Sequence, residues 1–129
     1  MFIDLDNFKT VNDTLGHDLG DSLLQKVSKR IQGCVGTGDT AARLGGDEFV
    51  LLIAGADRSA ASAMARRLVA ALSEPHLIDD HEIRATASIG VSLYPQDGLD
   101  RHALMKSADA AMYRAKGAGR NTFRFFSEA

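Results

Sequence analysis

The feature that most constrains this fold is at residues 45–48, where two adjacent glycines precede two adjacent carboxylates. Apolar segments flank it at residues 40–44 and 49–53, so the pattern predicts two antiparallel strands joined by a tight turn. Glycine tolerates the positive φ angles that such a turn needs. A turn alone does not require two acids, so Asp47 and Glu48 form either a solvated hairpin tip or half of a cation site.

Length and composition predict one globular domain over residues 1–129, because 129 residues that are 45% hydrophobic can bury a core. The single cysteine, Cys34, has no partner for a disulfide or a zinc site, which suits a reducing cytoplasm. No apolar run approaches the roughly 18–20 residues that span a bilayer. We therefore expect a soluble, cytoplasmic domain without direct membrane insertion.

Charge is spread unevenly along the chain. Residues 1–21 contain five aspartates and one lysine, whereas residues 101–129 contain six Lys or Arg and two acids. The net charge of −2 argues against binding to a nucleic acid polymer. An acidic and a basic cluster suit a metal-bound polyphosphate. The alternatives are that the two clusters attract each other or lie apart on the surface.

Hydrophobic periodicity predicts short strands that alternate with helices. Besides the hairpin, the expected strands are residues 1–5, 87–94 and 122–126, with two short pieces around a turn at 79–82. Two of the expected helices cover residues 8–15 and 58–73. Another begins at Asp18 or Asp21 and has its apolar stripe at residues 24–31, and the last follows the turn at 97–98, has its apolar stripe at 104–115 and ends at Gly117. This order implies an α+β sandwich, with a central mixed sheet of about five strands flanked by helices.

Three local patterns have ordinary structural interpretations. Asp6 is well placed to cap the first helix. The glycine-rich residues 33–38 follow a helix and lack Gly-Lys-Ser/Thr, so they predict a loop and no nucleotide fingerprint. His76 and His81 are five residues apart with no helix to align them, which favours surface histidines over metal ligands.

The carboxylates at the hairpin gain significance if the first strand is its neighbour in the sheet. Asp4 and Asp47 would then share a hard divalent cation such as Mg²⁺, and the Leu5 carbonyl would add a ligand. The helix that begins near Lys9 would present free N–H groups to phosphates. Lys116 and Arg120, at the end of the last helix, either compensate the helix dipole or clamp a polyphosphate.

Several motifs in this order resemble the GGDEF family of diguanylate cyclases over essentially the whole chain. They are Asp-Leu-Asp-Asn-Phe-Lys-Thr-Val-Asn-Asp at 4–13, Gly-His-Asp-Leu-Gly-Asp at 16–21, Arg-Leu-Gly-Gly-Asp-Glu-Phe at 43–49, Ala-Ser-Ile-Gly-Val at 87–91, and residues 108–121. The resemblance implies a polymerase-palm or nucleotide-cyclase-like sheet. It also implies condensation of two GTP molecules into cyclic di-GMP and pyrophosphate, with one GTP on each of two facing protomers.

The resemblance also implies roles for individual residues. Two Mg²⁺ or Mn²⁺ ions would be held by Asp4, the Leu5 carbonyl and Asp47, with Glu48 as a further ligand or as the base. The guanine edge would be read by Asn12 and Asp21. The triphosphate would be held by Phe8, Lys9, Lys116 and Arg120, with room left for the nucleotide by Gly45 and Gly46.

The chain departs from the family pattern in two ways. The usual upstream helix and the segment before the first strand are absent, so we expect an N-terminally truncated GGDEF domain that is slow and mostly monomeric. Tethering to the inner membrane through the missing upstream segments is compatible with this expectation. Of the family's inhibitory product site, Arg-x-x-Asp, only Asp39 is present, because Gly36 replaces the arginine. We therefore predict weak or absent product inhibition there.

The ending at residues 123–128 resembles the junction into an EAL phosphodiesterase domain, so fused sensory or EAL domains are expected partners. The main alternative function is then a weak or silent GTP-binding regulator of an attached EAL domain. A plain α/β interaction module would require the charge placements to be coincidental.

Overall fold

The computed structural model describes residues 1–127, which form a five-stranded mixed sheet, four helices and a separate two-stranded hairpin. The elements in chain order are β1 (Phe2–Leu5), α1 (Phe8–Leu15), α2 (His17–Cys34), β2 (Thr40–Gly45), β3 (Glu48–Leu52), α3 (Arg58–Ser73), β4 (His76–Ile78), β5 (His81–Ile83), β6 (Ala87–Val91), α4 (Arg101–Gly117) and β7 (Thr122–Phe125). The predicted α+β sandwich is confirmed. Glu128, part of the expected junction into an EAL domain, lies outside the described residues.

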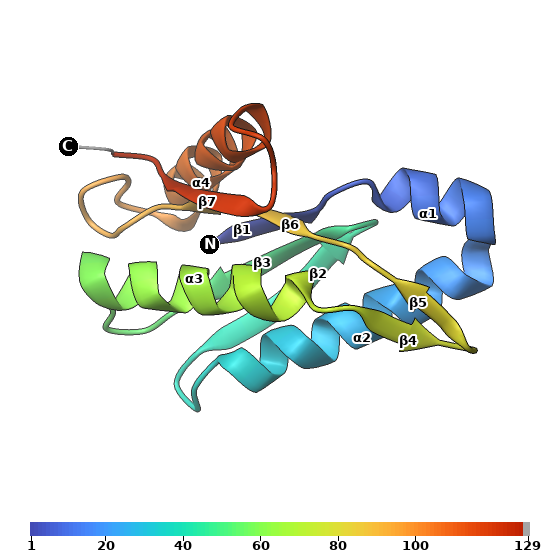
Figure 1. Ribbon diagram of the computed structural model, residues 1–129. Helices are drawn as coiled ribbons and strands as arrows, with labels where there is room; N and C mark the ends of the chain where they lie inside the picture. The colour runs from blue at the N-terminus through green and yellow to red at the C-terminus, as the bar shows by residue number, and fades with distance from the viewer. Residues whose placement is uncertain (128–129) are drawn as a thin grey trace.

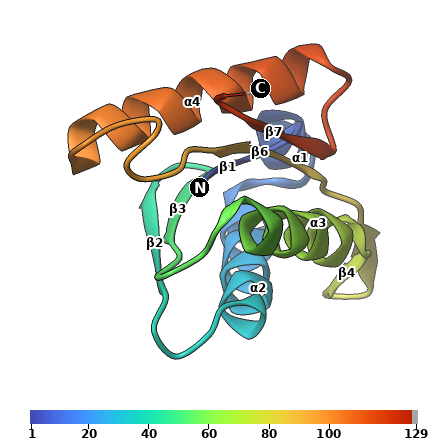
Figure 2. The same cartoon turned by 90° about the vertical axis from the view of Figure 1, so that its left-hand side faces the viewer.

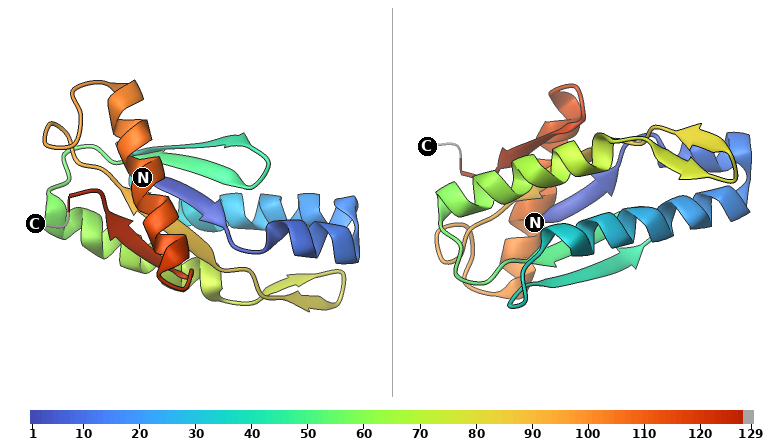
Figure 3. Two further views of the ribbon diagram at one scale, coloured as in Figure 1. Left: turned by 90° about the horizontal axis from the view of Figure 1, so that it is seen from above. Right: turned by 60° about the horizontal axis from the view of Figure 1, so that its bottom comes forward.

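The main sheet has the strand order β2-β3-β1-β6-β7, with β1 at its centre. Strand β1 pairs antiparallel with both β3 and β6, and β6 pairs parallel with β7. Figure 1 shows β4 and β5 beyond the end of α3, near α2, and Figure 3 shows them apart from the main sheet. This topology places the end of β1 beside the hairpin between β2 and β3.

Helices cover both faces of the sheet. Figure 2 shows α4 on one side and α2 with α3 on the other. Helix α3 turns Ala61, Ala65, Leu68 and Leu72 inward, as its apolar spacing predicts. Burial of each large apolar side chain in this core contributes roughly 1.5–3 kcal/mol.

Helix α4 packs directly on the backbone of β6. A Cβ atom at Gly90 would lie 1.8 Å from the Ala108 carbonyl oxygen and 2.4 Å from the Met112 nitrogen. Because Gly90 has no side chain, the helix approaches the sheet closely. This packing holds the last turn of α4, which carries Lys116, near the end of β1.

Two of the local predictions are wrong. Asp6 does not cap α1; Asn7 occupies the N-cap in a left-handed conformation without a side-chain cap bond, because the Asp6 carboxylate faces β6 instead. His76 is fully buried, since it packs beneath the C-terminal end of α3, whereas His81 is exposed as expected.

Smaller boundaries also differ. Strand β6 ends at Val91, three residues earlier than expected, and α2 begins at His17. Of the glycine-rich residues 33–38, which were predicted as a loop, Gly33 and Cys34 instead end α2, and residues 35–38 belong to the loop into β2. Within residues 1–127, none of the helices is both long and apolar enough to cross a membrane.

Candidate metal and nucleotide site

Pairing between β1 and β3 brings the two halves of the predicted cation site together. Asp4 lies opposite Glu48 in the register, and the Leu5 amide donates to the Asp47 carbonyl at 3.2 Å. The turn consists of Gly46 and Asp47 between a bulged β2 and β3, so it is shifted by one residue from the expected Gly-Gly turn. Gly45 and Gly46 have φ angles of 151° and 52°, which favour glycine.

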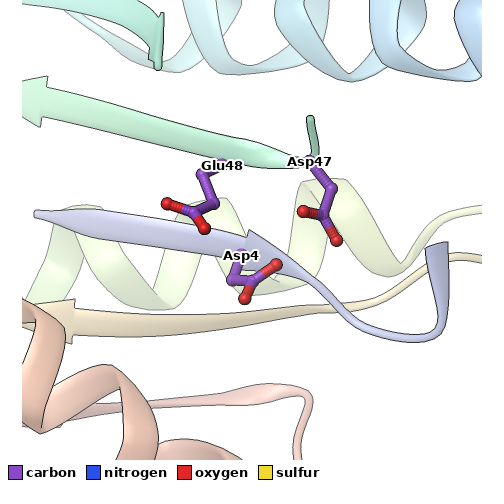
Figure 4. Close-up of side chains that lie close together, drawn as sticks. All are labelled: Asp4, Asp47 and Glu48. Atoms are coloured by element: carbon purple, nitrogen blue, oxygen red, sulfur yellow. The ribbon is translucent and has the colours of Figure 1, made fainter. Parts of the chain in front are cut away.

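Three carboxylates converge at this turn. Asp4, Asp47 and Glu48 each offer an oxygen, and these oxygens all lie within 4.8 Å of one another. Figure 4 shows the Asp4 side chain on β1 and the Asp47 side chain in the turn before β3 directed toward each other. Asp4 is 8% exposed, and its Oδ1 atom has no hydrogen-bond partner among residues 1–127.

The electrostatics of this cluster favour a cation. Burial raises the pKa of Asp47 to about 6, with a further rise from the negative charge of Asp4. A buried carboxylate oxygen without a partner costs free energy unless a cation or proton satisfies it. Because hard divalent ions prefer carboxylate oxygens, the three side chains fit Mg²⁺ or Mn²⁺.

Lys116 provides the positive charge beside this cluster. Its Nζ atom lies 2.6 Å from Asp4 Oδ2. Burial alone would lower the pKa of Lys116, but its hydrogen bond to Asp4 and the charges of the nearby aspartates outweigh burial and raise it. Lys116 therefore lies at the carboxylate cluster as well as in the last turn of α4, where a cation also compensates the helix dipole.

A second group of predicted residues meets at the junction of α1 and α2. A Cβ atom at Gly20 would lie 2.3 Å from Asn12 Oδ1 and 3.3 Å from Phe8 Cζ. The Asn12 side-chain nitrogen lies 2.9 Å from His17 Nδ1. Phe8 and Asn12 thus pack directly against the α2 backbone at Gly20, where a larger residue than glycine would collide with Asn12.

The remaining predicted substrate residues are not fixed by contacts with either group. Lys9, Asp21 and Arg120 are exposed, and in the described part of the chain none of them forms a salt bridge. Asp21 directly follows Gly20 on α2. Arg120 lies in the loop between α4 and β7, four residues after Lys116.

Asp39 has a structural role at the opposite end of the hairpin. Its carboxylate accepts hydrogen bonds from the Gly36 amide at 2.8 Å and the Ala54 amide at 3.1 Å. Both carboxylate oxygens of Asp39 are therefore engaged within the domain.

Sequence reasoning missed the contributions of Gly20, His17 and Asp6. Gly20 is a glycine inside a helix, which is a signal of close approach. Asp6 is 2% exposed and accepts hydrogen bonds from Thr86, Ser88 and Asn121. The only sequence signal for this role is its place two residues after Asp4, since alternate residues of an extended strand share a face.

Comparison with known proteins found a matching family model and related sequences. A family model described as "Diguanylate cyclase, GGDEF domain" matches residues 1–122. The bifunctional diguanylate cyclase/cyclic di-GMP phosphodiesterase MucR of Pseudomonas aeruginosa is 54% identical over 129 residues, which are all of this chain and 19% of MucR. The cyclic di-GMP phosphodiesterase NbdA of the same organism is 45% identical over 127 residues, 98% of this chain and 16% of NbdA.

The fold also matches solved structures. The structure of the GGDEF domain alone of TpbB (YfiN) from Pseudomonas aeruginosa superposes with a TM-score of 0.94 and 39% identity, covering 98% of this chain and 74% of that one. The chain spans about a fifth of the length of MucR and less of NbdA, so it corresponds to one part of each.

Proposed function

Because this chain belongs to the GGDEF domain family, which functions in cyclic di-GMP metabolism, we propose that it is a diguanylate cyclase domain. In the proposed reaction, the 3′-hydroxyl of each GTP attacks the α-phosphorus of the other. Each attack forms one P–O bond, breaks the bond to the β-phosphate and releases one pyrophosphate. The convergence of Asp4, Asp47 and Glu48 within 4.8 Å is the observation that carries this proposal.

The carboxylate cluster would hold two Mg²⁺ or Mn²⁺ ions. The ligands would be Asp4, the Leu5 carbonyl, Asp47 and Glu48, and their fit is supported by the unpartnered Asp4 Oδ1 and the raised pKa of Asp47. Bound divalent ions supply charge neutralisation at the reacting phosphate and activate the attacking hydroxyl. Where Glu48 is not a ligand, it would instead accept the hydroxyl proton, a contribution of roughly 10²- to 10⁴-fold.

Other residues of the chain would bind and orient GTP. Asn12 offers an amide next to the α2 backbone at Gly20, and with Asp21 it suits the acceptor and donors of a guanine edge. Phe8 would contact the nucleotide, and Lys9, Lys116 and Arg120 would neutralise the triphosphate. Gly45 and Gly46 have no side chains, and nothing lies within 4 Å of a Cβ atom at either position. The turn would therefore leave room for the nucleotide.

A second copy of the domain completes the proposed site, because each protomer holds one GTP. Reaction then requires two loaded protomers to face each other, and we expect a slow rate that rises with protein concentration. A dimeric site also means that neighbouring domains in a longer protein can control activity by aligning two copies.

The alternative is a weak or silent GTP-binding regulator of an attached EAL phosphodiesterase. It is favoured by the name of NbdA, a phosphodiesterase that is 45% identical over nearly the whole chain. The presence of Asp4, Asp47 and Glu48 in one cluster favours the cyclase.

Incubation of the chain at high concentration with GTP and Mg²⁺ or Mn²⁺ tests the proposal. We expect cyclic di-GMP and pyrophosphate, and their loss in Asp47→Ala but not in the exposed control Asp13→Ala. GTP binding without turnover, even after artificial dimerisation, would instead support the regulator.

A further inference from the structure

We propose that Asp6 is a positioning residue that holds the α4–β7 loop (residues 118–121), and with it Arg120, at the triphosphate side of the site. This inference rests on the proposed GTP-binding function. It concerns a carboxylate that directly follows β1 and lies outside the group of metal-binding candidates.

Asp6 joins three segments that are far apart in the sequence. Its Oδ1 atom accepts a hydrogen bond from the Ser88 hydroxyl at 2.7 Å. Its Oδ2 atom accepts from the Thr86 hydroxyl at 2.6 Å and from the Asn121 amide at 3.0 Å. Since Asp6 is 2% exposed, these contacts are shielded from water and their geometry is well defined.

The loop that Asp6 contacts has an unusual backbone. Gly119, Arg120 and Asn121 are consecutive residues with φ angles of 110°, 64° and 49°. Left-handed conformations are unfavourable for residues with a Cβ atom, so Arg120 and Asn121 need support from their surroundings. The Arg120 amide donates to the Ala115 carbonyl at 3.1 Å, and the Asn121 amide donates to Asp6.

The α4–β7 loop carries Arg120 and directly follows the last turn of α4, which carries Lys116. Lys116 is held at Asp4, four residues before Arg120. Figure 1 shows the loop descending from α4 close to the end of β1, where Asp6 follows. Asp4 and Asp6 therefore fix the two ends of the same segment, Asp4 through Lys116 and Asp6 through Asn121.

A carboxylate suits this position because each of the three contacts is a donor to Asp6. An asparagine can keep the loop contact if its Oδ1 faces Thr86 and Asn121 and its amide nitrogen faces the Ser88 hydroxyl, which can also accept. Alanine removes the contact, and serine is too short to replace it. Asparagine thus removes the negative charge of Asp6 but keeps the hydrogen bond to the loop, whereas alanine and serine remove both.

Titration calorimetry with α,β-methylene GTP, which cannot be cleaved at the reacting bond, and with GMP tests this role. We expect Asp6→Ala to weaken binding of the triphosphate analogue by about tenfold, the loss typical of one charge-assisted contact. GMP affinity should stay within about twofold, since the guanine residues lie on α1 and α2. If Asp6→Ala fails to fold, Asp6→Ser provides the same test, and Asp6→Asn should restore triphosphate affinity.

Ser88→Ala is the matched control, because it removes one hydrogen bond to Asp6 but leaves the loop contact. It should lower stability without changing the ratio of analogue to GMP affinity.

In a double-mutant cycle, Asp6→Ala combined with Arg120→Ala should bind the analogue no more weakly than Arg120→Ala alone. Additive losses in this cycle, or equal losses for analogue and GMP, would overturn the positioning role. Failure of the wild-type chain to bind the analogue would overturn the proposed GTP-binding function as well.

Discussion

Lys116 Nζ lies 2.6 Å from Asp4 Oδ2, so α4 places a cation at the edge of the carboxylate cluster formed by β1 and the β2–β3 turn. Asp4 is nearly buried, and its other oxygen has no partner within residues 1–127. Lys116 therefore partly compensates a charge that the fold would otherwise bury unpaired. In the proposed enzyme the same ammonium group would also contact the triphosphate.

Substitution of Lys116 by methionine should destabilise the metal-free domain by about 2 kcal/mol. The reason is the unpaired Asp4 carboxylate, and the value lies below the range for fully buried pairs because Lys116 remains partly accessible. Urea unfolding in the presence of a chelator measures the change. Asp4→Asn should recover most of the loss in the double variant, whereas Lys106→Met, at an exposed position of α4, should have little effect. Equal stability of Lys116→Met and wild type would contradict this interpretation.

Asp47→Asn should stabilise the metal-free domain at neutral pH. Burial raises the folded-state pKa of Asp47 from 3.8 to about 6, so the free energy of unfolding falls as the pH rises through this interval. Asparagine removes that cost, and Tm should increase at pH 7.5 but not at pH 3.5. Saturating Mn²⁺ should reverse the order, because asparagine is the weaker ligand. Asp13→Asn, on the exposed side of α1, is the control, and an equal Tm gain at both pH values would contradict the prediction.

Much of the fold could be predicted from the sequence because local patterns and packing agree. The apolar stripe of α3 and the Gly-Gly-Asp-Glu turn both specify structure over short distances. The closeness of Asp4 and Asp47 was predicted on the condition that the first strand and the hairpin are neighbours in one sheet, and β1 does pair with β3. The family motifs then predicted which residues meet, and the structure brings Asp4, Asp47 and Glu48 together.

The mistaken predictions concern residues whose partners are distant in the chain. Asp6 looks like a helix cap locally, but its hydrogen-bond partners lie 80, 82 and 115 residues away. His76 looks polar and exposed, but the ends of α2 and α3 cover it. Burial of a polar side chain depends on tertiary packing, which hydrophobic periodicity does not describe.

Gly90→Ala should destabilise the domain by about 3 kcal/mol or more, because the added methyl group would collide with the backbone of α4. Displacement of α4 would also move Lys116 away from Asp4. Urea unfolding measures the stability change. Gly33→Ala is the matched control, since nothing lies within 4 Å of a Cβ atom there and alanine favours the helix by up to about 1 kcal/mol. Similar stabilities for the two variants would show that α4 can shift without cost.

His76 should make the domain sensitive to mild acid. Burial, and then the positive charge of Arg30, lowers the pKa of His76 below its ordinary value of 6.5. The unfolded chain therefore takes up a proton first, and the free energy of unfolding falls below pH 6.5 by up to about 1.4 kcal/mol per pH unit. His76→Gln should flatten this slope in urea unfolding between pH 7.5 and 5, whereas the exposed His81→Gln should leave it nearly unchanged. An unchanged slope in His76→Gln would assign the acid sensitivity to other groups.

Cyclic di-GMP should bind weakly at Asp39, because both oxygens of this carboxylate already accept backbone hydrogen bonds and Gly36 supplies no cation. Asp39→Ala should therefore leave product affinity unchanged in titration calorimetry, while it lowers stability by about 1 kcal/mol. Gly36→Arg restores the Arg-x-x-Asp pattern, and a Cβ atom at Gly36 would lie at a tolerable 3.4 Å from Asp39 Oδ2. We expect that variant to gain about tenfold in product affinity, since a guanidinium adds charge-assisted bonds to phosphate. Tight product binding by the wild-type chain that Asp39→Ala abolishes would show instead that Asp39 exchanges its backbone partners for the ligand.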